Sequence, residues 1–194
     1  MHPFKFYLQM GFEHISDLAG FDHILFLVAL CAVYRLAQWR RLLILVTAFT
    51  IGHSITLALA SLGTLTLSSE LIEFLIPTTI LLTALHNVIG QPAQADTKKM
   101  GRNYAMALFF GLIHGMGFSN YFRALLMDDS SIVMPLLAFN LGIELGQLLV
   151  VAVIVSVAYL FLRTTRVQHR EWNLFVSGMA AGMAVLLMAE NRFW

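Results

Sequence analysis

The sequence predicts an all-α integral membrane protein: a polytopic bundle of six transmembrane helices, preceded by an N-terminal interfacial helix. Of its 194 residues, 59% are hydrophobic and only 12% are charged, whereas soluble domains carry about 25% charged residues. Apolar runs of roughly 20 residues, the length that crosses a bilayer as a helix, recur along the chain. Since no Pro-, Gly- or Ser-rich linker divides these runs, we expect a single transmembrane domain over residues 1–194.

The first half of the chain holds the interfacial helix and three spans. Residues 3–16 are aromatic and mildly amphipathic, which is typical of a helix that lies in the membrane interface or of the start of the first span. The first span is expected over 18–36, before a basic and aromatic loop, and the second over 42–62, before a turn-like polar stretch. The third is expected over 70–90, with Pro77 as a candidate kink.

The second half holds three further spans. A polar loop over 91–102 leads to the fourth span, expected over 103–122. An acidic loop over 128–131 precedes the fifth span, which is expected over 132–162 and is long enough to tilt or to project beyond the bilayer. The sixth span is expected over 172–190, after a basic stretch.

The distribution of Lys and Arg predicts the orientation, because short cytoplasmic loops are enriched in these residues. Nine of the twelve lie in or near the loops after the first, third and fifth spans: Arg35, Arg40, Arg41, Lys98, Lys99, Arg102, Arg163, Arg166 and Arg170. We therefore expect these loops on the cytoplasmic side and both termini outside.

Three pairs of glycines occur at the four-residue spacing that lets helix backbones approach closely. They are Gly111 with Gly115, Gly142 with Gly146, and Gly178 with Gly182. We expect helix contacts at these pairs, although the last pair fits generic bundle packing equally well.

Three histidines on different spans reach a similar depth. His53 and His114 each lie about 11 residues from the inner end of their span, or ~17 Å, and His23 lies ~20 Å up. Asp22 adjoins His23, and His14 lies further out. Ionisable groups at bilayer depth cost roughly 2.5–3.5 kcal/mol and are usually functional. A single buried histidine is often only hydrogen-bonded, but three at one depth with a carboxylate predict a shared site for Zn²⁺, Ni²⁺ or protons.

The fifth span carries a polar face. Asn140, Glu144 and Gln147 follow the i, i+4, i+7 spacing that places them on one side of a helix. This face is expected to point into the bundle. Glu144 could ligate a metal, take a proton or orient a ligand histidine, or it could be a buried carboxyl held neutral by its neighbours.

Other polar residues lie near the depth of the three histidines or on either side of it. Glu73, at the outer end of the third span, fits either an outer vestibule or the membrane interface, whereas His86 and Asn87 lie near its inner end. Ser54 follows His53 and could hydrogen-bond a substrate. A nucleophilic serine is not expected, because no Gly-x-Ser-x-Gly elbow is present.

Five blocks carry a family resemblance: residues 11–15, 20–26, 49–57, 110–118 and 139–147. In this order they resemble the HupE/UreJ-like family of polytopic inner-membrane proteins. The resemblance implies a bacterial-type inner (plasma) membrane location. Some members are regarded as nickel permeases that serve hydrogenase or urease, and their first span carries a histidine, five residues and then Asp-His.

This chain departs from that signature, because seven residues separate His14 from Asp22. Two extra residues turn a continuous helix by about 200°. We therefore expect His14 to face away from Asp22 and His23, unless Gly20 breaks the helix.

The first functional hypothesis is a permease for a divalent transition metal such as nickel or zinc. His14, Asp22 and Glu73 would collect the ion outside, and His86 and Asn87 would mark its exit. His23, His53, His114 and Glu144 would hold it between these points. A single chain of 194 residues is small for a transporter that works by alternating access, so this hypothesis favours a homo-oligomer.

The second hypothesis is an intramembrane metal-dependent hydrolase or acyltransferase. Three histidines with an open fourth position form a catalytic zinc site, with Asp22 or Glu144 as general base and Ser54 beside the substrate. The substrate would be a lipid or a membrane-anchored peptide from the outer leaflet. A membrane subunit that only assembles with partners is a third hypothesis, which the many intramembrane polar residues disfavour. The net charge of +1 gives no indication of a nucleic-acid partner, so the expected partners are the lipid bilayer and a metal ion.

Overall fold

The computed structural model describes residues 3–18, 20–65, 67–90, 97–126 and 132–193. These residues form α-helices and one short 3-10 helix, with no strand among them, so the all-α prediction is confirmed. The elements are α1 (Pro3–Ser16), α2 (Asp22–Cys31), η1 (Leu36–Gln38), α3 (Trp39–Ser61), α4 (Ser69–Ile89), α5 (Thr97–Gly117), α6 (Ser119–Leu125), α7 (Val133–Thr164) and α8 (His169–Glu190).

Four described segments are long and apolar enough to cross a membrane: Leu36–Ser61, α4, α7 and α8. They agree with the second, third, fifth and sixth predicted spans. The predicted span over 18–36 is different, because its helix α2 has only 10 residues, or about 15 Å of a core that is about 30 Å thick. The predicted span over 103–122 is also interrupted, since α5 ends at Gly117 and α6 starts at Ser119. Of the predicted loops, residues 91–96 and 127–131 lie outside the described part of the chain.

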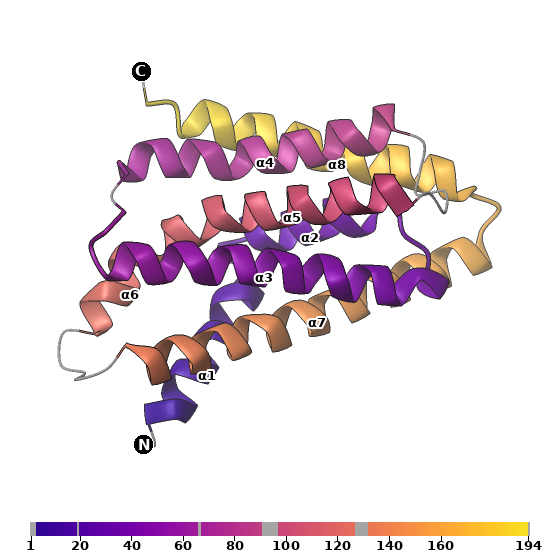
Figure 1. Cartoon of the computed structure of the whole chain (residues 1–194). Coiled ribbons are helices and arrows are strands. Elements are labelled where there is room, and N and C mark those ends of the chain that lie inside the picture. The colour runs from indigo at the N-terminus through magenta and orange to yellow at the C-terminus, as the bar shows by residue number, and fades with distance from the viewer. Residues whose placement is uncertain (1–2, 19, 66, 91–96, 127–131, 194) are drawn as a thin grey trace.

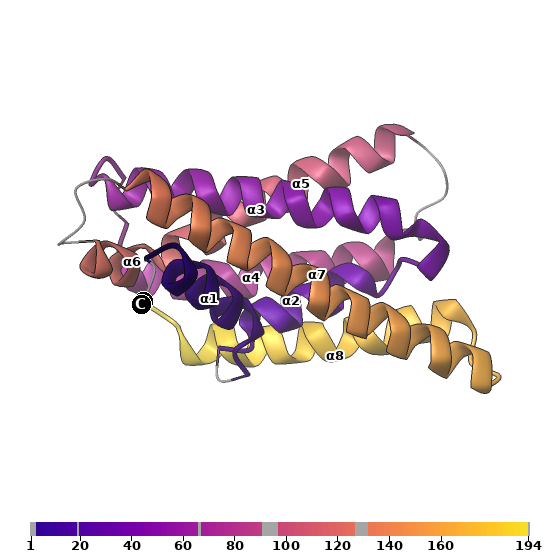
Figure 2. The ribbon, with the colours of Figure 1, turned by 90° about the horizontal axis from the view of Figure 1, so that it is seen from below.

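Helix α1 packs along α7, as Figure 2 shows. It matches the predicted segment 3–16 in its bounds, but it is part of the bundle, with Tyr7 and Ile15 buried. Two glycines permit this approach: a Cβ on Gly11 would collide with the Phe139 carbonyl, and one on Gly142 would collide with the Leu8 carbonyl. The contact expected at Gly142 is therefore present.

The helices run lengthwise beside one another, and most of the basic segments lie at one end. Both views place the C-terminal ends of α2, α4 and α7 and the N-terminal ends of α3, α5 and α8 at the same end of the bundle (Figure 1, Figure 2). The opposite end holds α6 and the start of α7. Helix α2 starts part-way along the bundle, so the residues of its first turn lie at mid-length.

Pro77 lies inside α4, which nevertheless continues as one helix to Ile89. A proline has no N–H to donate to the carbonyl four residues earlier, which here belongs to Glu73. Asn191 Nδ2 donates to this carbonyl at 3.3 Å, so the segment after α8 occupies the acceptor that Pro77 leaves free.

Candidate functional site

Four histidines from four helices meet inside the bundle. His14 comes from the last turn of α1, His23 from the first turn of α2, His53 from α3 and His114 from α5. The centroid of the His23 ring lies 4.6 Å from that of His14, 6.3 Å from that of His53 and 5.1 Å from that of His114. The ring centroids of His14 and His53 are 6.0 Å apart. We call these four residues the histidine cluster. His53 has no exposed surface and His114 is 1% exposed.

A break in the helix brings His14 into this cluster. Helix α1 ends at Ser16 and α2 begins at Asp22, so no continuous helix turns His14 away from His23. The sequence left open that a helix broken at Gly20 would allow His14 to face His23. Gly20 does lie in the break between α1 and α2. His14 and His23 therefore stand at the facing ends of two short helices. Interrupted helices of this kind build the substrate sites of many transporters.

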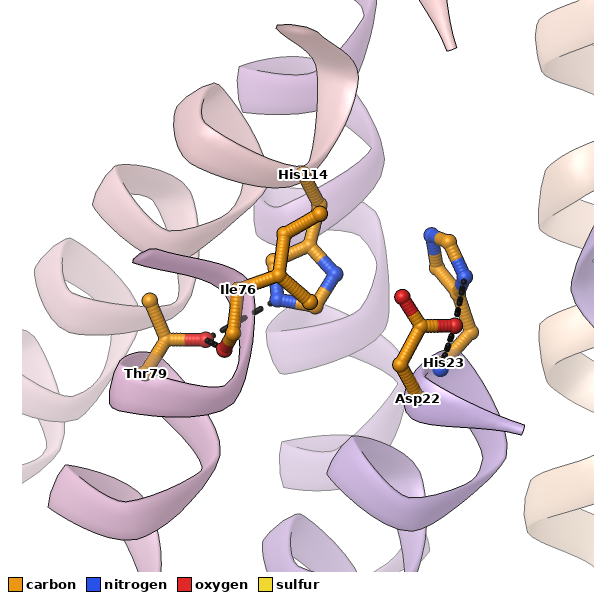
Figure 3. A network of polar contacts seen from close by, with 5 residues as sticks. All are labelled: Asp22, His23, Ile76, Thr79 and His114. Carbon is orange, nitrogen blue, oxygen red and sulfur yellow. Dashed lines mark hydrogen bonds and ion pairs between the residues drawn. The ribbon is translucent and has the colours of Figure 1, made fainter. Parts of the chain in front are cut away.

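Asp22 fixes the orientation of His23. Its Oδ1 atom accepts hydrogen bonds from the backbone N–H of His23 at 2.9 Å and from Nδ1 of the ring at 3.1 Å (Figure 3). A carboxylate only accepts, so Nδ1 carries a proton, and in the neutral ring Nε2 of His23 keeps its lone pair. Asp22 thus acts through His23, in the way that carboxylates orient metal-ligating histidines.

Thr79 does the same for His114, and the sequence did not single it out. Its hydroxyl donates to the Ile76 carbonyl at 2.7 Å and lies 2.9 Å from Nε2 of His114 (Figure 3). With the hydroxyl proton on the Ile76 carbonyl, Thr79 accepts from Nε2–H of His114. Nδ1 of His114 then keeps the free lone pair.

The cluster holds several buried nitrogens that have no hydrogen-bond partner among the described residues. They are Nε2 of His14, Nε2 of His23, both ring nitrogens of His53 and Nδ1 of His114. Buried polar atoms are nearly always paired, so such a concentration of unpartnered nitrogens favours an occupant that can pair with them. In their present orientations, however, no three His, Cys, Asp or Glu side chains of the described chain are placed to hold a metal ion together.

Aromatic side chains enclose the cluster. Phe26 and Phe49 stack at 4.9 Å and contact the ring of His114 at 5.3 and 5.1 Å. Phe118 lies 4.2 Å from the ring of His14, and it stacks on Phe139 at 4.9 Å. Water is therefore largely excluded, which strengthens any electrostatic interaction inside the cluster.

A surface cavity of about 610 Å³ reaches the cluster at His14, and we call it the vestibule. The carboxylates of Glu13 and Asp17 line it, together with the rings of Phe118 and Tyr121. A Cβ on Gly20 would lie 3.9 Å from Asp17 Oδ2 and 4.0 Å from Asp22 Oδ1, so the two aspartates flank this glycine. Acidic groups thus extend from the vestibule to Asp22.

Glu73 and Glu144 occupy other places. Glu73 is exposed on α4 and does not line the vestibule. Glu144 Oε1 accepts from the Thr47 hydroxyl at 2.6 Å, and one turn further on Gln147 Oε1 accepts from Thr50 at 2.8 Å. Asn140 bonds its own helix, through the Leu136 carbonyl at 2.8 Å. This polar face thus joins α7 to α3, and none of its three residues bonds a cluster histidine within the described chain.

The remaining predicted residues have structural contacts. Asn87 Nδ2 donates to the Ala29 carbonyl at 2.7 Å and to the Ser177 hydroxyl at 3.3 Å, which ties α4 to α2 and α8. Ser54 donates to the Thr50 carbonyl at 2.6 Å. His86 lies half-buried in the last turn of α4. Thr79 was missed because its contact with His114 depends on how α4 and α5 are rotated, and Asp17 because its place beside the vestibule depends on the break between α1 and α2.

Comparison with known proteins relates the chain to one family. The family model described as HupE / UreJ protein matches residues 1–192. No curated protein and no solved structure matches the chain. A match over almost the full length agrees with the apolar helices and with the resemblance in the five sequence blocks. The chain belongs to the HupE/UreJ family, and this membership implies a multi-pass membrane protein of the metal-transporter type.

Proposed function

We propose that the protein is a permease for a divalent transition metal ion of the nickel type, and that the histidine cluster holds the ion in transit. The observation that carries this proposal is the set of buried, unpartnered nitrogens on four converging histidines. Neutral imidazole nitrogens are the usual protein ligands of Ni²⁺ and similar ions. Zinc has no separate support from the family.

In this proposal the ion turns the rings inward as it binds. Asp22 and Thr79 each hold one nitrogen of their histidine, so that Nε2 of His23 and Nδ1 of His114 remain to coordinate. No hydrogen bond among the described residues fixes the ring of His53. A transit site must also release its ion, and loosely arranged ligands suit release better than a rigid cage.

The ion would enter through the vestibule. Glu13 and Asp17 attract cations, and Asp22 continues this negative path towards His23. The carbonyl end of α1 adds partial negative charge beside His14. Release would follow on the far side of Phe26 and Phe49, where Phe110 also contacts Phe26.

We further propose six crossings within one transmembrane domain over 1–194. Helices α1 and α2 in series would make the first crossing, and α5 with α6 would make the fourth. The basic end of the bundle would face the cytoplasm, with both termini outside the inner membrane. A homo-oligomer would supply the mass that one small copy lacks for alternating access.

Flux measurement tests the transport proposal. Purified protein in liposomes should admit Ni²⁺ to a trapped chelating fluorophore faster than protein-free liposomes do, while the isolated protein keeps little metal after dialysis. Tightly retained metal at one ion per chain, without flux, would contradict transport and would favour the metal-dependent hydrolase.

Removing the Thr79 hydroxyl should weaken ion binding. Thr79→Val keeps the shape of the side chain but frees Nε2 of His114, so we expect Ni²⁺ affinity to fall by about 10- to 100-fold. Thr79→Ser should restore it. Thr83→Val is the matched control, because Thr83 is buried one turn away on α4 and, within the described chain, its hydroxyl donates to the Thr79 carbonyl. Equal losses in both valine variants, measured by calorimetry, would assign Thr79 a packing role only.

Neutralising the acidic residues of the vestibule should raise KM for Ni²⁺ more than it lowers the maximal transport rate. In Glu13→Gln/Asp17→Asn we expect KM for Ni²⁺ to rise by about 10-fold at low ionic strength with the maximal rate little changed, because long-range attraction is lost. The increase should shrink as salt is added. Glu70→Gln is the control, since Glu70 is an exposed carboxylate that does not line the vestibule. An unchanged KM in the double variant would exclude the vestibule as the entrance.

A further inference from the structure

A second cavity, of about 430 Å³, lies at the basic end of the bundle, away from the histidine cluster. It is lined by residues of the connection between α2 and η1, of the C-terminal part of α7 and of the start of α8. Its wall is apolar, with Leu36, Val155, Ala158 and Leu162. Its polar groups are Arg35, Arg163 and His169, with the rings of Tyr34 and Tyr159. The cavity therefore combines a hydrocarbon-like wall with cations.

The charge of this cavity favours an anion. Arg163 is held beside the cavity, because its Nη1 donates to the Tyr159 hydroxyl at 3.2 Å and its guanidinium lies 5.9 Å from the centre of that ring. Arg35 lies on the neighbouring connection. None of the described lining residues is acidic. The nearby carboxylate of Glu171 accepts from the Gln168 backbone at 2.8 Å, as a helix cap.

His169 indicates which hydrogen-bonding group a ligand of this cavity needs. Its Nε2 lies 3.2 Å from the Val33 carbonyl, which can only accept, so Nε2 carries a proton. Its Nδ1 is buried and has no hydrogen-bond partner among the described residues. In the neutral ring Nδ1 accepts, so a matching ligand offers a hydroxyl donor near its negative charge.

The cavity also lies where a lipid headgroup would be. Trp39 is 52% exposed and Arg40 lies over its ring at 5.4 Å, a pairing typical of the membrane interface. The α7 residues Val155, Ala158 and Leu162 continue the apolar wall of the cavity along the helix, and acyl chains can lie on this wall.

We propose that this cavity binds one anionic phospholipid with a hydroxylated headgroup, of the phosphatidylglycerol class. The phosphate lies between Arg35 and Arg163, a headgroup hydroxyl donates to Nδ1 of His169, and the acyl chains follow the apolar wall along α7. Basic pockets between transmembrane helices bind acidic headgroups in this way. The lipid links the α2–η1 connection to α7 and α8, and so it stabilises the bundle. This proposal does not depend on what the protein transports.

Lipid titration of the full chain in neutral detergent tests the proposal. By native mass spectrometry we expect one phosphatidylglycerol to bind in preference to phosphatidylcholine, and to raise the midpoint of thermal unfolding. Arg35→Gln/Arg163→Gln should weaken this binding by about 25-fold, from about 5-fold for each arginine. Arg166→Gln/Arg170→Gln is the control, because these arginines are exposed at the same end but do not line the cavity.

Three results would overturn the proposal. Equal losses in the two double variants would indicate only general attraction to a basic surface. Equal binding of phosphatidylcholine would show that the negative charge is not recognised. Inorganic phosphate or glycerol phosphate, if either reproduced the full rise in the unfolding midpoint, would identify a phosphate site without a lipid. Each variant is first compared with the wild type in phosphatidylcholine, so that a folding defect is recognised separately.

Discussion

His53→Leu should abolish metal uptake and leave the protein at least as stable as the wild type. His53 is fully buried, and neither ring nitrogen has a hydrogen-bond partner within the described chain. A buried polar group without a partner costs about 1–3 kcal/mol, so an apolar side chain of similar size should raise the free energy of unfolding. Uptake should fall by more than about 100-fold, since substitutions of the groups that merely orient a ligand already cost 10- to 100-fold in metal affinity.

The opposite signs of the two effects make this variant decisive. A histidine kept for packing would lose nothing in transport when leucine replaces it. If the variant is more stable but does not take up metal, His53 is a functional residue that lowers the stability of the wild type. Proteoliposome uptake and thermal unfolding of the same preparation measure the two quantities. Normal uptake by His53→Leu would remove His53 from the ion path.

Gly111→Ala should disrupt the packing that positions His53 and His114. A Cβ on Gly111 would collide with the Phe49 carbonyl, and one on Gly115 would collide with the His53 carbonyl and the Thr56 hydroxyl. Backbone cannot move aside as a flexible side chain can, so we expect a loss of at least about 1–3 kcal/mol in the free energy of unfolding. The amount of folded protein in the membrane should fall accordingly.

Gly178→Ala provides the matched comparison. A Cβ at Gly178 or Gly182 would meet nothing within 4 Å. Alanine in a helix interior is favoured over glycine by roughly 0.5–1 kcal/mol, so this variant should be neutral or slightly stabilised. Thermal unfolding of the two variants separates them. Equal stability of Gly111→Ala and Gly178→Ala would show that α3 and α5 do not pack as closely as described.

The convergence of the three histidines was predictable, because membrane geometry reduces the problem to the depth of each residue along its span. Helices that cross a bilayer must lie side by side, so counting residues along each span placed His23, His53 and His114 at one depth, and the structure brings their rings together. The same counting could not decide the position of His14. That position depends on whether the chain continues as a helix through Gly20, which is decided by packing of α1 against α7.

The rotation of each helix about its own axis could not be predicted from the sequence either. The spacing of Asn140, Glu144 and Gln147 correctly placed Glu144 and Gln147 on a face that contacts another helix, but not which helix they meet, and their contacts prove to be Thr47 and Thr50. Thr79 resembles any other threonine of α4 until its distance to His114 is known. The short α2 was also not predicted, because the expected span over 18–36 includes Gly20 and the residues before Asp22, where the helix begins.

Anomalous scattering from crystals grown with Ni²⁺ tests the central claim most directly. Data collected on both sides of the nickel absorption edge locate the ion without reference to any assay of transport. The account predicts a peak among the rings of His14, His23, His53 and His114, with Nε2 of His23 and Nδ1 of His114 turned towards it. A protein that carries Ni²⁺ only at other positions, with this cluster unchanged, would contradict it.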